Sequence, residues 1–402
     1  MQCLICKKPL PFNSKKRLCK EHSSPQYLFK PVNLLKGNEL EGTSPSVFVG
    51  EYGYPHVNVG ILSPPVRDKN AWIYDSPTFW ASEDFGKSNI LSLRSSLINS
   101  KFNVTVKQQS NKLLELAQEL TLSLKPTDVD ISLSNKPKSK LNFDNINLPH
   151  GPQASLLKAE LSSNPSVNKK IEKTVYDTDF KSSDALSYLY KNKIDENSLI
   201  KLLSIGNLGI KSQRKLVPTK WSITAVHDNL GKFLLNKVKD NDSTGYRLYF
   251  SGYLHNYFLI LFFPDVWSYE LFETYVGSSL DYTTDHEFYD GRTSYASNCV
   301  GGYYASRLAV LEKLNSLRRQ AKVLVLRFTE LSYDTPLGVW VVLEAVRKCL
   351  STKGLEFSSK EEMLDSARKI IYNKFRININ YFLNKSKILE YINNQKRLFQ
   401  YF

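Results

Sequence analysis

The stretch Gly245-Tyr-Arg-Leu-Tyr-Phe-Ser-Gly-Tyr-Leu-His-Asn-Tyr-Phe-Leu-Ile-Leu-Phe-Phe-Pro264 carries the strongest β-strand signal in the chain. Aromatic and branched side chains of this kind favour a pleated, largely buried surface. A Ser-Gly bend at 251–252 divides two apolar runs, so the stretch predicts a central hairpin or two adjacent strands. His255 and Asn256 are strongly polar residues in the second run, and such a pair can simply satisfy local backbone groups.

Helix and strand patterns alternate on either side of this hairpin. Apolar periodicity predicts helices at 111–124, 303–321, 337–350, 359–372 and 381–392, and Ser222 is a candidate cap for a helix from 223 to about 239. Short strands are expected at 46–50, 57–61 and 322–327. The alternation predicts a mixed α/β (α+β) body of sheets and helices.

The 402 residues are enough for two or three domains. Between 125 and 170 the composition shifts to Lys, Asn, Ser and Pro with little apolar periodicity, which predicts a surface connection or a weakly structured insertion. It would separate two units or form a loop across one domain. The expected organisation is therefore a zinc knuckle at 1–30, an N-terminal α/β part at 31–125, a connection at 126–178, a C-terminal α/β part at 179–392 and a docking tail at 393–402.

The first 22 residues contain the pattern Cys3-x2-Cys6-x12-Cys19-x2-His22. Two close ligand pairs joined by a loop suit a tetrahedral Zn²⁺, and four protein ligands leave no open position, so the predicted zinc is structural. The alternative is a disordered basic arm with fortuitous cysteines. Basic residues decorate the same loops and either contact nucleic acid or remain solvated, and the candidates are Lys15, Lys16, Arg17 and Lys20.

The formal charge of +15 indicates a polyanionic partner such as a nucleic acid, and charge alone does not specify which one. It is concentrated at the two ends, with seven Lys or Arg against one Glu in residues 1–30 and nine against four acidic residues in 360–402. Five cysteines, three of them in the first nineteen residues, favour a reducing compartment, so a cytoplasmic location is expected. The seven-residue apolar run 257–263 is too short to span a membrane, so no membrane partner is expected.

A Gly- and Tyr-rich turn follows the first predicted strand, in Ser44-Pro-Ser-Val-Phe-Val-Gly-Glu-Tyr-Gly-Tyr-Pro-His-Val-Asn-Val-Gly60. Gly-Tyr alternation lets a backbone approach a ligand closely while aromatic faces stack on it. Tyr52, Tyr54 and His56 are therefore candidates for a ligand pocket. The alternative is a tight hairpin whose tyrosines pack sideways into the core.

The chain ends in Gln395-Lys-Arg-Leu-Phe-Gln-Tyr-Phe402. A single 3₁₀-like turn would place Leu398 beside Tyr401 on one apolar face that Phe402 extends, with Gln395 one turn upstream. The spacing Q-x-x-L-x-x-Y-F resembles the box by which repair and replication proteins bind the DNA sliding clamp (PCNA). The alternative is a terminal helix that packs Leu398 and Tyr401 on its own domain.

Four further stretches make the resemblance specific to one family. The Cys-x2-Cys pair and the 44–60 stretch, followed by Leu216-Val-Pro-Thr-Lys-Trp-Ser-Ile-Thr-Ala-Val226, Pro336-Leu-Gly-Val-Trp-Val-Val342 and the terminal box, resemble the archaeal Nre family over nearly the whole chain. The resemblance implies a DNA-damage-response protein that binds the sliding clamp. It implies a pathway and no particular reaction.

The main functional hypothesis is a DNA-repair factor held at DNA through the clamp, with the zinc knuckle and basic ends aiding nucleic-acid binding. One alternative is a nucleotide- or nucleic-acid-processing enzyme, with a possible nucleotide ligand in a pocket of the central body; a structural adaptor is the other. The pocket candidates are Tyr52, Tyr54, His56, His227, His255 and Arg292. The sequence contains no H-E-x-x-H or G-x-S-x-G motif, and no catalytic residue is assigned. A Gly301-Gly302 turn before a helix is either an anion site or a plain helix start.

Overall fold

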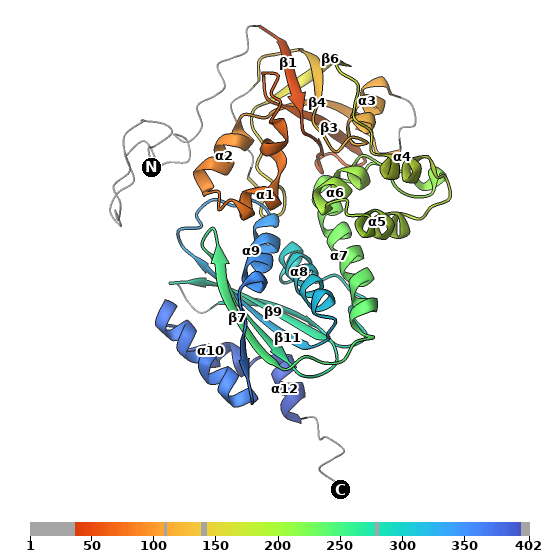
Figure 1. Ribbon diagram of the computed structural model, residues 1–402. Coiled ribbons are helices and arrows are strands. Elements are labelled where there is room, and N and C mark those ends of the chain that lie inside the picture. Colours follow the sequence, from red (N-terminus) through yellow and green to blue (C-terminus); the bar gives the residue numbers. More distant parts are fainter. Residues whose placement is uncertain (1–36, 108–110, 138–142, 278–280, 395–402) are drawn as a thin grey trace, which may run out of the picture.

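The computed structural model describes residues 37–107, 111–137, 143–277 and 281–394. Within these residues, two six-stranded mixed sheets lie in separate lobes (Figure 1). We call residues 37–218 the N-terminal lobe and residues 219–394 the C-terminal lobe. The prediction of a mixed α/β body is confirmed. The predicted zinc knuckle and the octapeptide 395–402 lie outside the described residues.

The sheet of the N-terminal lobe has the strand order β1-β5-β6-β4-β3-β2. Neighbouring strands are antiparallel except β4 and β6, which run parallel. Its strands are β1 (Glu39–Ser44), β2 (Ser46–Val49), β3 (His56–Ser63), β4 (Ile98–Thr105), β5 (Thr127–Leu133) and β6 (Gln153–Leu161). The predicted strands at 46–50 and 57–61 are thus confirmed as the edge pair β2–β3.

The sheet of the C-terminal lobe has the strand order β10-β9-β11-β8-β7-β12, in which only the described pair β9–β11 is parallel. Its strands are β7 (Tyr246–Tyr253), β8 (Asn256–Phe263), β9 (Ser268–Val276), β10 (Tyr282–Glu287), β11 (Lys322–Glu330) and β12 (Leu355–Phe357). The predicted hairpin at 245–264 and the predicted buried strand at 322–327 are confirmed.

Strand β8 is apolar without alternation because helices cover both faces of its sheet. Phe258, Ile260 and Phe262 pack into the core under α7, α8 and α9, whereas Leu259 and Leu261 pack into the core on the opposite face. Figure 1 shows α8 and α9 on one side of this sheet and α10 and α12 on the other. The quoted stretch therefore forms the middle layer of the C-terminal lobe.

The bend in this hairpin differs from the prediction. The chain turns at Leu254 and His255, both of which have positive φ, and not at the Ser-Gly pair, which lies inside β7. Gly252 faces Tyr257 across the strand pair, and a Cβ at residue 252 would lie 2.6 Å from the Tyr257 ring. The glycine therefore makes room for an aromatic neighbour and does not form the turn.

The prediction of a surface connection at 125–170 was wrong for much of that segment. Residues 127–133 and 153–161 form β5 and β6, which lie inside the first sheet. In β5 every second residue is buried, including Val129 and Ile131. The alternation of buried and outward residues is present in the sequence Thr-Asp-Val-Asp-Ile-Ser-Leu. The outward Asp and Ser residues give the segment a polar composition, which obscured the strand pattern.

Short helices connect and cover the strands of the N-terminal lobe. They are η3 (Ala71–Asp75), α1 (Pro77–Ser82), α2 (Lys87–Ser95), α3 (Lys112–Leu120), α4 (Lys169–Tyr176), α5 (Ser182–Lys191), α6 (Glu196–Ser204) and η4 (Lys211–Gln213). The predicted helix at 111–124 is α3, whose start is fixed by the Asn111 side chain accepting from the backbone N–H groups of Leu113 and Leu114.

The C-terminal lobe contains α7 (Thr219–Val238), α8 (Val300–Leu317), α9 (Trp340–Ser351), α10 (Lys360–Phe375), α11 (Asn380–Leu383) and α12 (Lys387–Asn394). The predicted cap at Ser222 was wrong, because α7 begins directly after Pro218. Proline favours a helix start one turn earlier, since it lacks the N–H that would be unpaired there. Ser222 lies buried within the first turn.

The single helix expected at 381–392 is divided into α11 and α12 by a buried carboxylate. Glu270 of β9 accepts hydrogen bonds from Ser386 Oγ at 2.5 Å, from the Lys387 N–H at 3.0 Å and from the Ile388 N–H at 3.1 Å. A carboxylate at a helix N-terminus pairs with amides that have no partner within the helix. Glu270 therefore fixes the start of α12 on the sheet.

A partly buried arginine links the helices of the two lobes. Arg347 of α9 pairs with Glu196 of α6 at 2.9 Å, with Glu312 of α8 at 2.8 Å and with Glu344 of its own helix at 2.7 Å. Glu344 also accepts a hydrogen bond from Thr78 of α1 at 3.0 Å. The arrangement of α1, α6, α8 and α9 at the junction is therefore specified by one cation and three carboxylates.

Among the described helices, none has the length and apolar character that crossing a bilayer requires.

Candidate functional site

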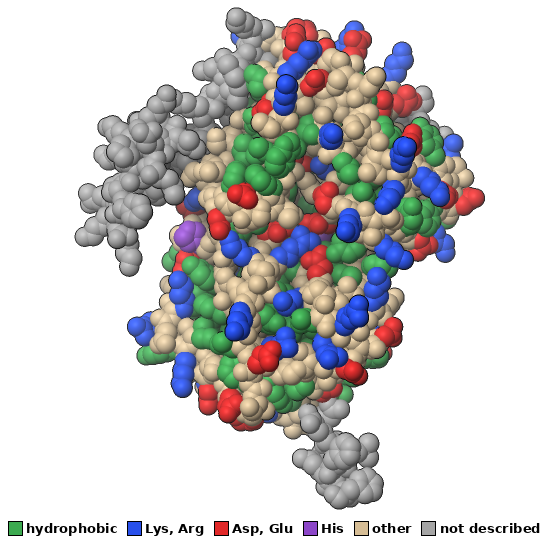
Figure 2. Space-filling view, in the orientation of Figure 1, with side chains coloured by type: hydrophobic (Ala, Val, Ile, Leu, Met, Phe, Trp, Pro, Cys, Tyr) green, Lys and Arg blue, Asp and Glu red, His purple; other side chains and the backbone are tan. Residues whose placement is uncertain are grey.

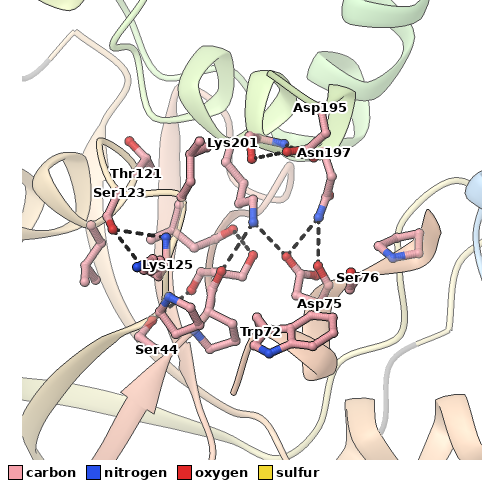
Figure 3. A pocket seen from close by; sticks show the side chains of 18 of the residues that line it. Ser44, Trp72, Asp75, Ser76, Thr121, Ser123, Lys125, Asp195, Asn197 and Lys201 are labelled. Carbon is pink, nitrogen blue, oxygen red and sulfur yellow. Dashed lines mark hydrogen bonds and ion pairs between the residues drawn. The ribbon is translucent and has the colours of Figure 1, made fainter. Parts of the chain in front are cut away.

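A cavity of about 370 Å³ lies in the N-terminal lobe where four segments meet. They are the β1–β2 link at 44–46, η3 with the start of α1, the α3–β5 loop at 121–126 and the first turns of α6. In Figure 3, Asn197 and Lys201 reach from α6 toward Asp75, and Trp72 lies on the other side of Asp75. The volume suits a small polar ligand, since small-molecule pockets begin near 300 Å³.

Asp75, the last residue of η3, is the charged centre of the cavity wall. Its side chain is 3% exposed, and its two carboxylate oxygens pair with Arg94 Nη1 at 2.7 Å and with Lys201 Nζ at 2.9 Å. The second oxygen also accepts from Asn197 Nδ2 at 3.1 Å. Arg94 is equally buried and donates in addition to the Pro149 carbonyl at 2.7 Å. The ion pair with Arg94 therefore connects η3 to α2, and the ion pair with Lys201 connects η3 to α6.

The electrostatics keep Asp75 ionised. Burial alone would raise the pKa of Asp75, but the Lys201 ammonium and the Arg94 guanidinium outweigh it and hold the pKa at about 2. A carboxylate with so low a pKa is a poor proton acceptor near neutral pH. The arrangement is therefore suited to orienting a ligand and not to general base catalysis.

The remaining walls of the cavity are mostly neutral and polar. The lining hydroxyl groups belong to Ser44, Ser46, Ser76, Thr78, Thr121, Ser123 and Ser198. Trp72 stands at the edge with 39% of its surface exposed and its ring packed edge-on against Phe79 at 4.8 Å. It also lines the adjacent hollow that contains Lys69 and Lys125. An aromatic face flanked by lysines can stack on a planar ligand that carries negative charge.

Two further hollows follow strand β2 beyond this cavity. A small one of about 60 Å³ lies against Val47 and Phe48 and extends to His227 of α7. Burial lowers the pKa of His227 to about 4, although Glu196 opposes the shift, so this imidazole is neutral in the core. The other, of about 220 Å³, lies under the Gly- and Tyr-rich turn. The Ser-Pro-Ser-Val-Phe-Val-Gly segment thus borders all three.

The structure brings together only part of the predicted ligand pocket. Tyr52, Tyr54 and His56 lie on the exposed β2–β3 turn, where the Tyr54 ring packs on Trp221 of α7 at 5.2 Å. The predicted hairpin geometry is confirmed, but both tyrosines face solvent and do not pack into the core. His227 is buried inside α7.

The other two predicted pocket residues lie in the C-terminal lobe. His255 is exposed at the β7–β8 turn and pairs with Glu330 at 2.9 Å. Arg292 pairs with Asp285 at 3.2 Å and donates to the carbonyls of His286, Ser294 and Tyr295. Both side chains hold loops of their own lobe.

The Gly301-Gly302 turn has the features of a plain helix start. Asp285 Oδ2 accepts the N–H groups of Asn298 at 2.9 Å and of Cys299 at 2.8 Å, immediately before α8. A Cβ on Gly302 would lie 2.7 Å from a carboxylate oxygen of Glu273. Two acidic side chains therefore face the turn, and this environment disfavours a phosphate.

The predicted metal, clamp-binding and basic residues all lie outside the described residues. They are Cys3, Cys6, Cys19 and His22; Gln395, Leu398, Tyr401 and Phe402; and Lys15, Lys16, Arg17 and Lys20. In the part of the chain that the structure describes, no group of three or more His, Cys, Asp or Glu side chains is placed to hold a metal ion. These predictions therefore stay predictions.

Comparison with known families assigns the chain. The family model described as "Archaeal Nre, N-terminal" matches residues 19–280, and "Archaeal Nre, C-terminal" matches residues 287–401. The chain belongs to the archaeal Nre family. The first Nre match covers the whole N-terminal lobe of the described structure and continues through β9, so it ends inside the second sheet.

Curated relatives match over most of their length. The "DNA repair protein NreA" of Haloferax volcanii is 36% identical over 84% of this chain and 83% of its own. The "DNA repair protein NreB" of Archaeoglobus fulgidus is 37% identical over 83% and 86%, and the NreA of that organism is 36% identical over 93% and 95%. No solved structure matches this Nre chain significantly.

The residues that shape the cavity in this Nre protein were missed from sequence, with one exception. The Ser-Pro-Ser segment belongs to the 44–60 stretch that the sequence analysis had identified. Trp72, Asp75 and Lys201 belong to no recognisable motif. Asp75 and Lys201 are separated by 126 positions, and Asp75 by 19 from Arg94. No local spacing relates them, because their meeting depends on how α2 and α6 pack on η3.

Proposed function

We propose that this chain is a DNA-repair protein that is held at DNA by the sliding clamp through residues 395–402. A structural zinc ion at Cys3, Cys6, Cys19 and His22 and the basic ends of the chain support its contact with DNA. The observation that carries the repair role is the set of three Nre relatives named DNA repair proteins, each matched over at least 83% of its length.

The fixed position of α12 supports the role of the last eight residues in clamp docking. Helix α12 ends at Asn394, immediately before Gln395, and its first turn is bonded to the buried Glu270. In Figure 1, α12 lies at the end of the C-terminal lobe that is remote from the N-terminal lobe. A docking peptide that follows such a helix would leave the protein from a defined point, with the body directed away from the clamp.

The distribution of charge supports a contribution to DNA binding from the chain ends. In Figure 2, Lys and Arg side chains are spread over both lobes with Asp and Glu among them, and they do not gather into one basic patch on this face. Residues 1–30 carry seven Lys or Arg against one Glu. Phosphate contacts are salt-sensitive and independent of sequence, so such an end would tether the protein to DNA without choosing a site.

A survival experiment tests the proposed function. Cells of the source organism that lack this gene should be complemented with wild-type protein or with the double variant Tyr401→Ala/Phe402→Ala and treated with a DNA-damaging agent. We expect wild-type protein to restore survival and the double variant to restore much less at equal protein level. Survival of the deletion strain at the wild-type level would refute the repair role, and full rescue by the double variant would refute recruitment through the tail.

The cavity at Asp75 favours a second candidate function, the binding of a small polar ligand such as a nucleotide. Its hydroxyl groups, Lys201 and the exposed face of Trp72 offer hydrogen bonds, positive charge and stacking at one place. Titration with nucleotides should quench the fluorescence of the wild-type protein and not that of Trp72→Phe, which keeps an aromatic ring but loses the indole. Equal signals from both proteins would exclude binding beside Trp72.

A further inference from the structure

The cavity of about 220 Å³ under the β2–β3 turn has the lining of a nucleobase pocket. Its walls come from the turn itself, from β3 and β4, and from the loop that precedes β6. Four of its lining side chains are amides, and they are Asn58, Asn99, Asn147 and Gln153. Each amide presents a donor and an acceptor side by side, which is the pattern on the edge of a base.

Two of these amides are buried and incompletely bonded. Asn99 is 3% exposed and Asn147 is 8% exposed, and the side-chain oxygen of each is without a hydrogen-bond partner in the described structure. Unpaired buried polar atoms are uncommon because they lose their bonds to water and gain none in return. By contrast, Gln153 is engaged, since its oxygen accepts from Lys101 Nζ at 3.0 Å. Asn99 and Asn147 therefore have hydrogen-bonding capacity at the cavity wall that the described protein does not use.

A glycine keeps the Asn99 amide in place. A Cβ at Gly60 would lie 1.8 Å from the Asn99 side-chain oxygen, so no other residue fits at position 60 while that amide stays where it is. Gly60 lies on β3 at the end of the Gly- and Tyr-rich stretch and pairs with Lys101 of β4. The glycine explains how an amide side chain can lie flat against the sheet inside the cavity.

The charges around the cavity suit a neutral ligand group. Among the described residues that line it, Lys101 is the one cation, and Glu51 and Asp144 are the carboxylates. Lys220 of α7 pairs with both carboxylates, at 3.1 Å and 3.4 Å. Positive and negative groups are thus balanced, whereas a phosphate site would carry an excess of cations. A base meets this condition and a phosphate group does not.

Aromatic rings line the cavity and continue outside it. Phe48 packs against His150 at 4.8 Å within the wall, and Tyr52 stands at the mouth with 84% of its surface exposed. Two residues further along the turn, Tyr54 packs on Trp221, and both rings are about half exposed. Trp221 adjoins Lys220, which is bonded to Glu51 at the cavity. Exposed rings in this position can stack on the bases next to one that has entered the cavity.

We propose that this cavity receives a single unstacked base of a DNA strand, with Asn99 and Asn147 bonded to the edge of the base and Tyr52 and Tyr54 stacked on its neighbours. This inference rests on the proposed DNA-repair function, and it specifies a single base as the part of DNA that the protein recognises. Proteins that inspect or modify a base draw it out of the stack into such a pocket. The occupant is a base on a strand and not a free nucleoside, because the rings outside the cavity have a role only when neighbouring bases are present.

The test uses the full-length protein and a thirteen-nucleotide single strand of thymidines with one central 2-aminopurine. Fluorescence anisotropy gives the affinity, and 2-aminopurine emission reports whether that base changes its environment. We expect Asn99→Ala and Asn147→Ala each to weaken binding roughly tenfold and to abolish the change in emission. Asn103→Ala is the matched control, because Asn103 is exposed on the same strand β4, and it should behave as wild type.

Stability measurements separate loss of the pocket from loss of the fold. Asn99→Ala should unfold in urea at or above the wild-type midpoint, because it removes an amide oxygen that has no partner and not a formed hydrogen bond. Wild-type affinity and emission in both pocket variants would overturn the proposal, as would unchanged emission when the wild-type protein binds the strand. The free 2-aminopurine deoxyriboside should bind far more weakly than the strand, and equal affinity would overturn the assignment to a strand.

The outcome is independent of the clamp. Tyr401→Ala/Phe402→Ala should bind the strand as wild type does, since the tail is not part of the pocket. If the pocket variants bind the strand as wild type does, the pocket proposal is refuted but the clamp proposal is not. If the wild-type protein does not bind the clamp, the clamp proposal is refuted but the result for the pocket remains valid.

Discussion

Replacing Asp75 by Asn should destabilise the protein strongly at neutral pH. The variant keeps the shape of the side chain but leaves Arg94, which is only 3% exposed, without its counter-charge. Breaking one partner of a buried ion pair costs about 3–5 kcal/mol, because the remaining charge stays away from water. Lys201 is 17% exposed and can turn toward solvent, so most of the loss comes from Arg94.

The same variant should change how stability depends on pH. The pKa of Asp75 is held at about 2 in the folded protein, below the ordinary value of 3.8. A group with a lowered folded-state pKa stabilises the protein above its unfolded pKa and loses that contribution as pH falls toward the folded pKa. For these two pKa values, the free energy of unfolding of the wild type falls by about 1 kcal/mol by pH 3 and by about 2 kcal/mol by pH 2. The Asp75→Asn variant does not show this fall, because its side-chain amide does not titrate.

Urea unfolding at pH 7, 5, 4 and 3, followed by circular dichroism, measures both effects. The free-energy gap between wild type and Asp75→Asn should be widest at pH 7 and should narrow by about 1 kcal/mol at pH 3. Asp130→Asn is the control, because Asp130 forms an exposed pair with Arg67 at 3.0 Å, and it should change stability little. A gap of equal size at pH 7 and pH 3, or no gap at all, would refute the reasoning.

Four further predictions concern other parts of the chain. Metal analysis should find close to one Zn²⁺ per chain that is lost in Cys3→Ser, and zinc that survives this change would exclude the predicted site. Arg347→Met should lower the free energy of unfolding by about 3 kcal/mol or more, because it removes the cation shared by the buried carboxylates of Glu196 and Glu344 and by the partly buried Glu312. An unchanged urea midpoint would contradict this. Glu270→Gln should speed hydrogen exchange in α12 selectively, because one or more amides at its start lose an acceptor, and unaltered exchange would show that other contacts hold the helix. Replacing Lys15, Lys16 and Arg17 by Ala should weaken DNA binding and reduce its salt dependence. Unchanged binding would mean that these charges are only solvated.

The sequence predicted best those elements whose signal is local. Strand β8 has an uninterrupted apolar run, α3 has periodic leucines after an Asn cap, and the β2–β3 pair is separated by a turn rich in Gly and Pro. Each of these patterns arises from contacts within the element or with its immediate neighbour. Strand β5 was missed because its outward residues are polar, and that polarity concealed the buried alternation. Strand β6 was missed because a register shift interrupts its alternation and leaves Leu157 exposed.

The candidate sites depended on tertiary contacts that no spacing in the sequence encodes. Asp75 meets Lys201 only because α6 packs against η3, and Asn99 and Asn147 line one cavity only because the loop before β6 lies beside β4. The sequence did identify the Gly- and Tyr-rich turn as a place where a ligand could stack. It could not relate that turn to the buried amides, which lie on segments far from it in the chain.

Binding to the purified sliding clamp, measured by titration calorimetry, tests the central proposal most directly. Aromatic and aliphatic anchors usually cost about 2 kcal/mol or more when truncated, which is roughly thirtyfold in affinity. Wild-type protein and Phe399→Ala, which leaves the four box residues intact, should bind the clamp, and Tyr401→Ala/Phe402→Ala should not, with a melting temperature close to that of wild type. Clamp binding by the double variant at wild-type strength would contradict the account, and so would a lowered melting temperature without clamp binding in the wild type.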